Sequence, residues 1–174
     1  VYVGAQGPDM IRMSAKHADG VLINAAHPRD FEWASDRIAE GAAERPADRG
    51  AFDAVAYASV SVAEDGDRAR EAARAPVAFI VGGATPPVLE RHGIDRERAS
   101  EVAALVEAGD LREAFAEVSE EMIDAFSVAG TPDRVARRFE ALSEYVDGVV
   151  AGAPLGPDPE TAITLAGRTL RRAD

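Results

Sequence analysis

The residues with the clearest chemical potential form the turn Gly4-Ala5-Gln6-Gly7, near the start of the printed sequence. The β-formers Val1–Val3 precede this turn, and Pro8 follows it at a position suited to the first turn of a helix. A strand that leads through such a turn into a helix leaves free backbone N–H groups, and the helix dipole favours an anion there. We therefore interpret Gly4, Ala5, Gln6 and Gly7 as a cradle for the phosphate of a flavin-like coenzyme. The local pattern also fits an ordinary strand–helix turn that holds no ligand.

Gly7 has two expected roles in this cradle. It lets the backbone approach a phosphate closely, and it tolerates a left-handed conformation that other residues oppose. We therefore expect a side chain at Gly7 to weaken coenzyme binding without unfolding the protein.

Other chemistry has little support in the sequence. The absence of cysteine excludes disulfides and thiolate catalysis, and His17, His27 and His92 lack the spacing of a metal site, so no metal is expected. His27 follows a predicted strand, where it could contact the coenzyme or simply be solvated. His92 precedes a glycine, where a cation would complement a helix dipole. The catalytic residue stays unknown.

The composition describes one domain, or a large piece of one, of 174 residues with enough apolar material for a core. A net charge of −12 argues against nucleic acid as a partner. No apolar run approaches the roughly 20 residues that span a bilayer, and no signal peptide is apparent. We therefore expect a cytoplasmic protein that does not enter a membrane. Because the sequence opens inside a strand without methionine, we also expect that something precedes it.

Lysine is nearly absent, since Lys16 is the single lysine among 19 basic residues. An acidic, lysine-poor surface is expected of a protein that works in concentrated salt, where the Debye length falls to about 3 Å at 1 M and self-repulsion is screened. The alternative is a genome that favours arginine and alanine codons.

The sequence pattern alternates strands with helices, which predicts an α/β fold with a parallel sheet. Four βα units amount to half of a (β/α)8 barrel, and an isolated half leaves two open sheet edges. A last helix begins at Pro159, with Ala162, Ile163, Leu165 and Leu170 expected on its inward face. The predicted strands are Val1–Gly4, Val21–Asn24, Ala54–Val62 and Gly148–Ala151, all parallel and adjacent in this order.

Residues 76–126 break this alternation and are expected to form a helical insertion within the single domain 1–174. Apart from Val77–Val81, which has the composition of a strand, the segment divides into short helices separated by clear stop signals. The insertion is far longer than one crossover requires, and such insertions usually lie over an active-site face.

Several segments resemble one known family along the full length of the chain. They are YVGAQGP, DGVLINAAHP, AFIVGG with PPVLERHGID, DAFSVAGTPDRV and GVVAGAPLGP. These segments resemble the C-terminal half of the methylenetetrahydromethanopterin reductases, a branch of the luciferase-like monooxygenase superfamily of (β/α)8 TIM barrels. The GTP-x-x-V helix start is common across the superfamily, whereas ERHGID and GAQGP point to the reductase branch.

The resemblance implies an oxidoreductase that transfers a hydride between the deazaflavin coenzyme F420 and a methylene-tetrahydropterin of the methanopterin or folate type. It implies that the turns after the first two strands lie near the coenzyme phosphate. The cofactor-binding residues would then be Gly4, Ala5, Gln6 and Gly7 with Asn24 and Ala25, and Leu22 would lie beneath the ring or its linker.

The resemblance also shows what this sequence lacks. The family's first four strands are absent, as are its non-proline cis peptide and the acidic residues proposed as proton donors. The chain would then be a truncated protein, the product of a fragmentary gene, or half of a barrel completed by another chain. As its protein partner we expect either further copies of the chain in a homo-oligomer or an N-terminal half. Two other functions stay open, an FMN-dependent luciferase-like monooxygenase and a non-catalytic fragment.

Overall fold

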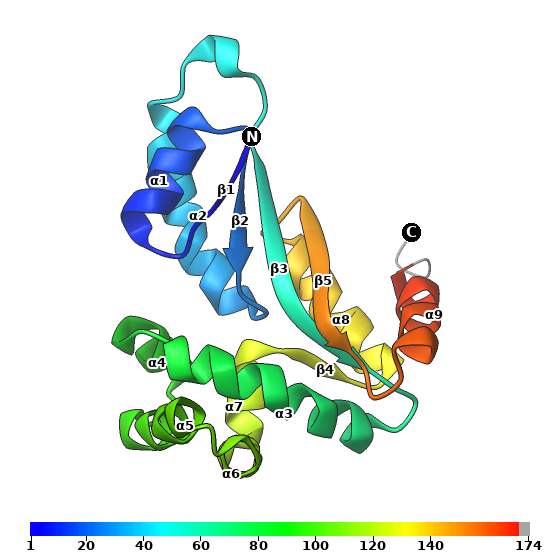
Figure 1. Cartoon of the computed structure of the whole chain (residues 1–174). Coiled ribbons are helices and arrows are strands. Elements are labelled where there is room, and N and C mark those ends of the chain that lie inside the picture. Colours follow the sequence, from blue (N-terminus) through cyan, green and yellow to red (C-terminus); the bar gives the residue numbers. More distant parts are fainter. Residues whose placement is uncertain (171–174) are drawn as a thin grey trace.

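A computed structural model of the chain describes residues 1–170, in which helices and parallel strands alternate (Figure 1). The strands are β1 (Tyr2–Gly4), β2 (Gly20–Asn24), β3 (Asp53–Val62), β4 (Val128–Gly130) and β5 (Gly148–Leu155). The helices are α1 (Pro8–His17), α2 (Pro28–Ala43), α3 (Gly66–Gly83), α4 (Pro86–His92), α5 (Arg96–Ala108), α6 (Leu111–Glu117), α7 (Glu120–Phe126), α8 (Pro132–Ser143) and α9 (Pro159–Leu170), with a short 3-10 helix η1 (Ala47–Arg49).

The sheet is organised around β3, the longest strand. Its first half pairs with β2, which pairs in turn with β1, and β5 pairs with β3 along the opposite side. All of these pairs are parallel, so the four predicted strands and their order β1-β2-β3-β5 are confirmed. The last strand continues four residues beyond the predicted end at Ala151, to Leu155.

The sequence prediction missed β4. This strand pairs with Val60–Val62 at the end of β3. It lies on the same side of β3 as β2, which pairs with the first half of the strand, because β5 pairs along the other side. Three residues are too few to show alternation, and all three of them are buried, so the sequence carries no period-two signal there.

The expectation of a strand at Val77–Val81 is wrong, because these residues belong to α3. Buried residues recur every four positions along this helix, at Ala69, Ala73, Val77 and Val81, which is the helical period. A short apolar run does not distinguish a strand from a buried helix, and α3 also continues through Pro76.

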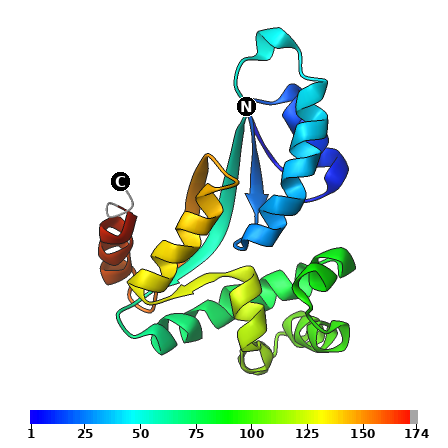
Figure 2. The same cartoon turned by 180° about the vertical axis from the view of Figure 1, so that it is seen from behind.

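Two apolar cores hold the fold together. The first packs the outer face of the sheet against α1, α2, α8 and α9, with Val21, Ile23 and Phe31 among its buried members. The second lies among α3 to α7 and includes Val102, Met122 and Ile123. Figures 1 and 2 both show α3 to α7 gathered as a separate helical layer, beyond the end of the sheet at which β2 stops.

The other face of the sheet is open within residues 1–170. Side chains alternate along a strand, so Tyr2, Tyr57 and Val150 point away from the buried side, and they are 53%, 40% and 43% exposed. Within residues 1–170, β1, β4 and β5 each pair with a single strand, and β1 and β5 lie at the two ends of the order β1-β2-β3-β5. Ile163, expected to face inward, is 59% exposed. The side chain of Leu170, also expected to face inward, lies outside the described part of the structure.

Close packing of α1 on α2 depends on Gly41. A Cβ atom at this position would overlap the carbonyl oxygen of Arg12 and come within 2.8 Å of the Cβ atom of Ala15. We predict that Gly41→Ala lowers the free energy of unfolding by about 1 to 3 kcal/mol, because the helices must separate.

Gly83→Ala is the matched control for this prediction. Gly83 ends α3, and a Cβ atom there meets nothing within 4 Å, so the change should be neutral or stabilise the protein by up to about 1 kcal/mol. Urea unfolding measures both variants. Equal stability of Gly41→Ala and the wild type would contradict the packing argument.

Candidate functional site

The opening turn lies directly beside the end of β2. The amide of Ala5 donates to the carbonyl oxygen of Leu22 at 3.0 Å, and Nε2 of Gln6 donates to the carbonyl oxygen of Asn24, also at 3.0 Å. The structure therefore brings the Gly4–Gly7 turn and the Asn24 turn together at the carboxyl edge of the sheet, which is where open parallel sheets bind ligands.

The four turn residues contribute in different ways. Ala5 is buried in the sheet core, so only its backbone can face a ligand. Around Gly4 and Gly7 there is open space, because a Cβ atom added at either meets nothing within 4 Å. Gln6 is exposed, and its side chain is tied to the neighbouring turn. A ligand can thus approach the backbone closely at both glycines.

The backbone of Gly7 differs from the expectation. Gly7 has φ −84° and ψ 152°, an extended conformation that any residue adopts, so the expected left-handed backbone is wrong. Gly7 is the N-cap of α1, and no side chain caps that end. The first intrahelical bond runs from the amide of Ile11 to the carbonyl oxygen of Gly7, which leaves the preceding amides of the first turn for a ligand or water.

The other predicted coenzyme-binding residues, Leu22, Asn24 and Ala25, differ in whether they face the open side of the sheet or the core. Leu22 pairs with Gly4 and Val55 in register, and it lies on the sheet face opposite to the buried Val21. Asn24 is exposed at the end of β2, whereas Ala25 packs partly against the core. Leu22 and Asn24 can therefore face a ligand above the sheet.

A buried polar cluster next to this edge was not predicted from the sequence. Nε2 of His92 lies 3.0 Å and 3.1 Å from the two carboxylate oxygens of Asp30, and Nη1 of Arg91 donates to Oδ1 of Asp30 at 2.7 Å. The rings of His27 and His92 lie 5.1 Å apart, edge to face. These contacts join the start of α2 to the end of α4, so they attach the helical layer to the sheet.

His27 has a defined place in this cluster. It is the N-cap of α2, and its Nδ1 accepts a hydrogen bond from the amide of Arg29 at 3.1 Å. Burial, with the nearby charges of Arg138 and His92, lowers the pKa of His27 to about 4. At neutral pH the ring is therefore uncharged, and because Nδ1 accepts, its proton lies on Nε2, which can donate one hydrogen bond.

Asp30 is also buried, but its hydrogen-bond partners keep it charged. Burial by itself would raise the pKa of Asp30, but hydrogen bonds from His92 and Arg91 outweigh it and hold the pKa below its usual value. The carboxylate thus stays ionised and partnered on both sides. Within residues 1–170, no group of three or more His, Asp and Glu side chains is placed to hold a metal ion.

Comparison with known proteins identifies the family. The luciferase-like monooxygenase family model matches residues 1–149, most of the chain. The chain belongs to the luciferase-like monooxygenase family. In the part of the chain that the structure describes, no helix is long and apolar enough to cross a membrane.

Within the luciferase-like family, the chain is similar to 5,10-methylenetetrahydromethanopterin reductases from two organisms. It is 50% identical to 5,10-methylenetetrahydromethanopterin reductase of Archaeoglobus fulgidus over 98% of this chain, and 48% identical to that of Methanopyrus kandleri over 96% of it. The matches cover 53% and 48% of those two proteins, so the chain spans about half the length of the curated relatives it matches.

Two solved structures confirm the fold. The coenzyme F420 dependent tetrahydromethanopterin reductase of Methanopyrus kandleri matches 97% of this chain with a TM-score of 0.90 and 47% identity, and 49% of that chain is covered. An F420-dependent secondary alcohol dehydrogenase, 19% identical with a TM-score of 0.69, shares the fold. The predicted C-terminal half of a (β/α)8 barrel is confirmed, and its sheet is not closed.

The pKa of His27 predicts a specific loss of stability in acid. Between about pH 6.5 and pH 4, His27 binds a proton in the unfolded protein but not in the folded protein. The contribution of neutral His27 to the free energy of unfolding is therefore complete above pH 6.5 and is lost as the pH falls towards 4. His27→Asn keeps an N-cap acceptor without a titrating group. We predict that the free energy of unfolding falls by about 2 to 3 kcal/mol less in His27→Asn than in the wild type when the pH is lowered from about 7 to 4.5.

Denaturant unfolding at each pH measures this difference. The control is His17→Asn, which removes an exposed imidazole from α1 and leaves the cluster intact. Identical pH dependence of His27→Asn and the wild type would show that the environment of His27 does not suppress its protonation.

Proposed function

We propose that this chain is the coenzyme-binding half of an oxidoreductase that transfers a hydride between coenzyme F420 and a methylene-tetrahydropterin. The observation that carries the proposal is the 50% identity to 5,10-methylenetetrahydromethanopterin reductase across nearly the whole chain. The agreement of the backbone with the F420-dependent reductase of Methanopyrus kandleri supports it further.

The geometry of the opening turn supports a role in binding the coenzyme phosphate. The backbones at Gly4 and Gly7 are open to a ligand, and the uncapped amides of α1 lie next to them. Asp9 in the same turn carries a negative charge, but Arg12 pairs with it at 2.8 Å. In this proposal the amides of the first turn bind the phosphate, and the Gln6–Asn24 hydrogen bond holds the two turns in place.

Leu22 and Asn24 would contact the rest of the coenzyme, because they lie on the open face of the sheet beside Gly4. Bound F420 supplies the hydride-transfer chemistry. The apolar side chain of Leu22 excludes water from the ring or its linker, and Asn24 offers a polar contact at the strand end. The substrate is a methanopterin-type or folate-type pterin.

The open face and the two sheet edges support completion by an N-terminal half. Tyr2 and Val150 on the edge strands, and Tyr57 between them, expose apolar surface that a closed barrel would bury. In this proposal four further strands pair with β1 and β5 and supply the catalytic acid. Such a half could come from the same longer protein or from another chain.

The coenzyme and the activity are tested on the protein completed with its N-terminal half. F420 bound in the purified protein, recognised by its absorbance spectrum, with reduction of a methylene-tetrahydropterin, would support the proposal. Bound FMN with oxygen-dependent turnover would favour the monooxygenase alternative. Absence of both coenzyme binding and turnover would favour a non-catalytic fragment.

Gly7→Val tests the phosphate site directly. Because the added side chain meets no atom of the folded chain near its Cβ, the variant should fold, and any loss of binding reports crowding of the ligand. We predict that coenzyme binding weakens by about 2 to 4 kcal/mol, the scale of lost charged hydrogen bonds. Gln6→Ala should cost less, because it removes one turn contact and no backbone donor.

Coenzyme titration measures the affinities, and circular dichroism checks folding. Gly83→Ala serves as the control glycine, since it is equally open but lies at the end of α3. Wild-type affinity in Gly7→Val would mean that the phosphate is held elsewhere, such as by the turns after β3 and β5.

The net charge of the chain supports the proposal that the protein works in a cytoplasm rich in salt. With −12 net charge and Lys16 as the one lysine, the folded state repels itself at low ionic strength. We predict that the melting temperature rises as salt increases from about 0.1 M to above 1 M, because screening lowers this repulsion. A melting temperature that stays constant across this range would contradict adaptation to salt.

A further inference from the structure

A second candidate binding site lies away from the opening turn. A cavity of about 260 Å³, open to solvent on one side, lies between the end of α7, the start of β4 and one face of α8. None of its lining residues belongs to the turns after β1 and β2. Its polar lining consists mainly of Arg134, Arg137 and Arg138 from α8, Asp124 from α7 and Ser127.

The cavity concentrates positive charge in an acidic protein. Positions 134, 137 and 138 fall on one face of α8, because residues three and four apart are neighbours on a helix. Three guanidinium groups and one carboxylate leave a formal excess of two positive charges in the lining, whereas the chain carries −12 overall. Like charges so close on a helix repel each other unless an anion lies between them.

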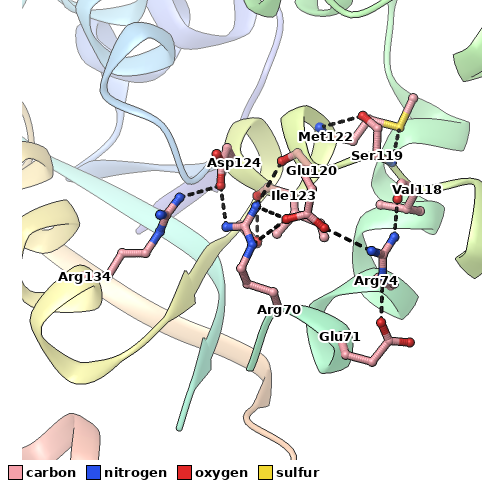
Figure 3. Close-up of polar contacts among 11 residues, drawn as sticks. Arg70, Glu71, Arg74, Val118, Ser119, Glu120, Met122, Ile123, Asp124 and Arg134 are labelled. Carbon is pink, nitrogen blue, oxygen red and sulfur yellow. Dashed lines mark hydrogen bonds and ion pairs between the residues drawn. The ribbon is translucent and has the colours of Figure 1, made fainter. Parts of the chain in front are cut away.

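The single carboxylate of the lining is already shared (Figure 3). Oδ1 of Asp124 accepts hydrogen bonds from Nη1 of Arg70 at 2.6 Å and from Nη2 of Arg134 at 2.7 Å. The nearby Glu120 is bound by Arg70 and by Nη2 of Arg74, the latter at 3.0 Å. Asp124 is therefore shared between Arg70 of α3 and Arg134 of α8, and Glu120 is bound by the α3 arginines. Neither carboxylate forms an ion pair with Arg137 or Arg138, so the excess positive charge lies on these two side chains.

Arg138 and Arg137 carry most of this excess. Nη1 of Arg138 donates only to neutral carbonyl oxygens, those of Ala26 at 3.2 Å and Asp124 at 3.3 Å. Burial lowers the pKa of Arg138, and the nearby carboxylate of Asp124 opposes this shift only in part, while the charge of Arg134 adds to it. Arg137 is exposed at the cavity, and its side chain has neither a hydrogen bond nor an ion pair among residues 1–170.

We propose that this cavity is a binding site for a phosphate dianion, free or as the phosphate group of a small metabolite. A dianion matches the excess charge of the lining, and guanidinium groups bind phosphate oxygens in paired hydrogen bonds. The cavity is smaller than the roughly 300–1,000 Å³ of sites for drug-sized ligands, so it suits the phosphate group itself. The site is separate from the turn proposed to hold the coenzyme and does not rest on that proposal.

Phosphate titration followed by amide NMR tests the site. The protein is titrated without coenzyme, with inorganic phosphate and in parallel with glycerol 3-phosphate, and chloride keeps the ionic strength constant. We expect saturable shifts at Val128 and Ala129, the backbone that lines the cavity. Tighter binding of glycerol 3-phosphate would indicate a metabolite, and equal or tighter binding of inorganic phosphate would indicate the free ion.

Arg137→Gln and Arg112→Gln separate site binding from general charge effects. Both arginines are exposed, and neither side chain has a hydrogen bond within the described residues, so both variants should fold. Arg112 lies on α6, outside the cavity. Arg137→Gln should weaken phosphate binding about fivefold to tenfold, while Arg112→Gln should bind like the wild type.

Two results would overturn the proposal. One is the absence of saturable shifts at Val128 and Ala129, which would mean that phosphate does not enter the cavity. The other is an equal loss of affinity in the two variants, which would mean that phosphate responds only to net charge.

Discussion

The fold depends on parallel pairing along both sides of β3. This ten-residue strand holds β2 and then β4 on one side and β5 on the other. Every second residue of β3 from Ala54 to Val62 is buried against the helices. A shift of register by one residue would turn these apolar side chains to the open face of the sheet. The same pairing places the ends of β1 and β2 together, and this arrangement brings the Gly4–Gly7 turn within hydrogen-bond distance of Asn24.

Charge pairs, together with apolar contacts, hold the helical layer against the sheet. Asp30 of α2 is bound by Arg91 and His92 of α4, and Arg134 of α8 pairs with Asp124 of α7. Removing one partner of a buried pair leaves an uncompensated charge, which costs more than the pair contributes. The position of this layer is therefore sensitive to single charged residues, whereas the sheet core is secured by many small apolar contacts.

The sequence was sufficient for the strands that alternate with helices and for the helices with strong start and stop signals. It was insufficient for β4, whose three buried residues show no period, and for Val77–Val81, where a helical stripe looks like a strand. His27 and His92 meet only through the packing of α4 on α2, which no local pattern encodes. The extended backbone at Gly7 likewise depends on the turn's path, since glycine permits several conformations.

The segment from Asn24 to Asp30 links both candidate sites to the rest of the protein. Gln6 binds the carbonyl oxygen of Asn24 from the opening turn, and Arg138 binds the carbonyl oxygen of Ala26 from the cavity on α8. At its far end, Asp30 is bound by the helical layer. Three separate parts of the structure thus hold one short segment. A ligand at the opening turn would bind beside a backbone that is already fixed, so little ordering of this segment would oppose binding.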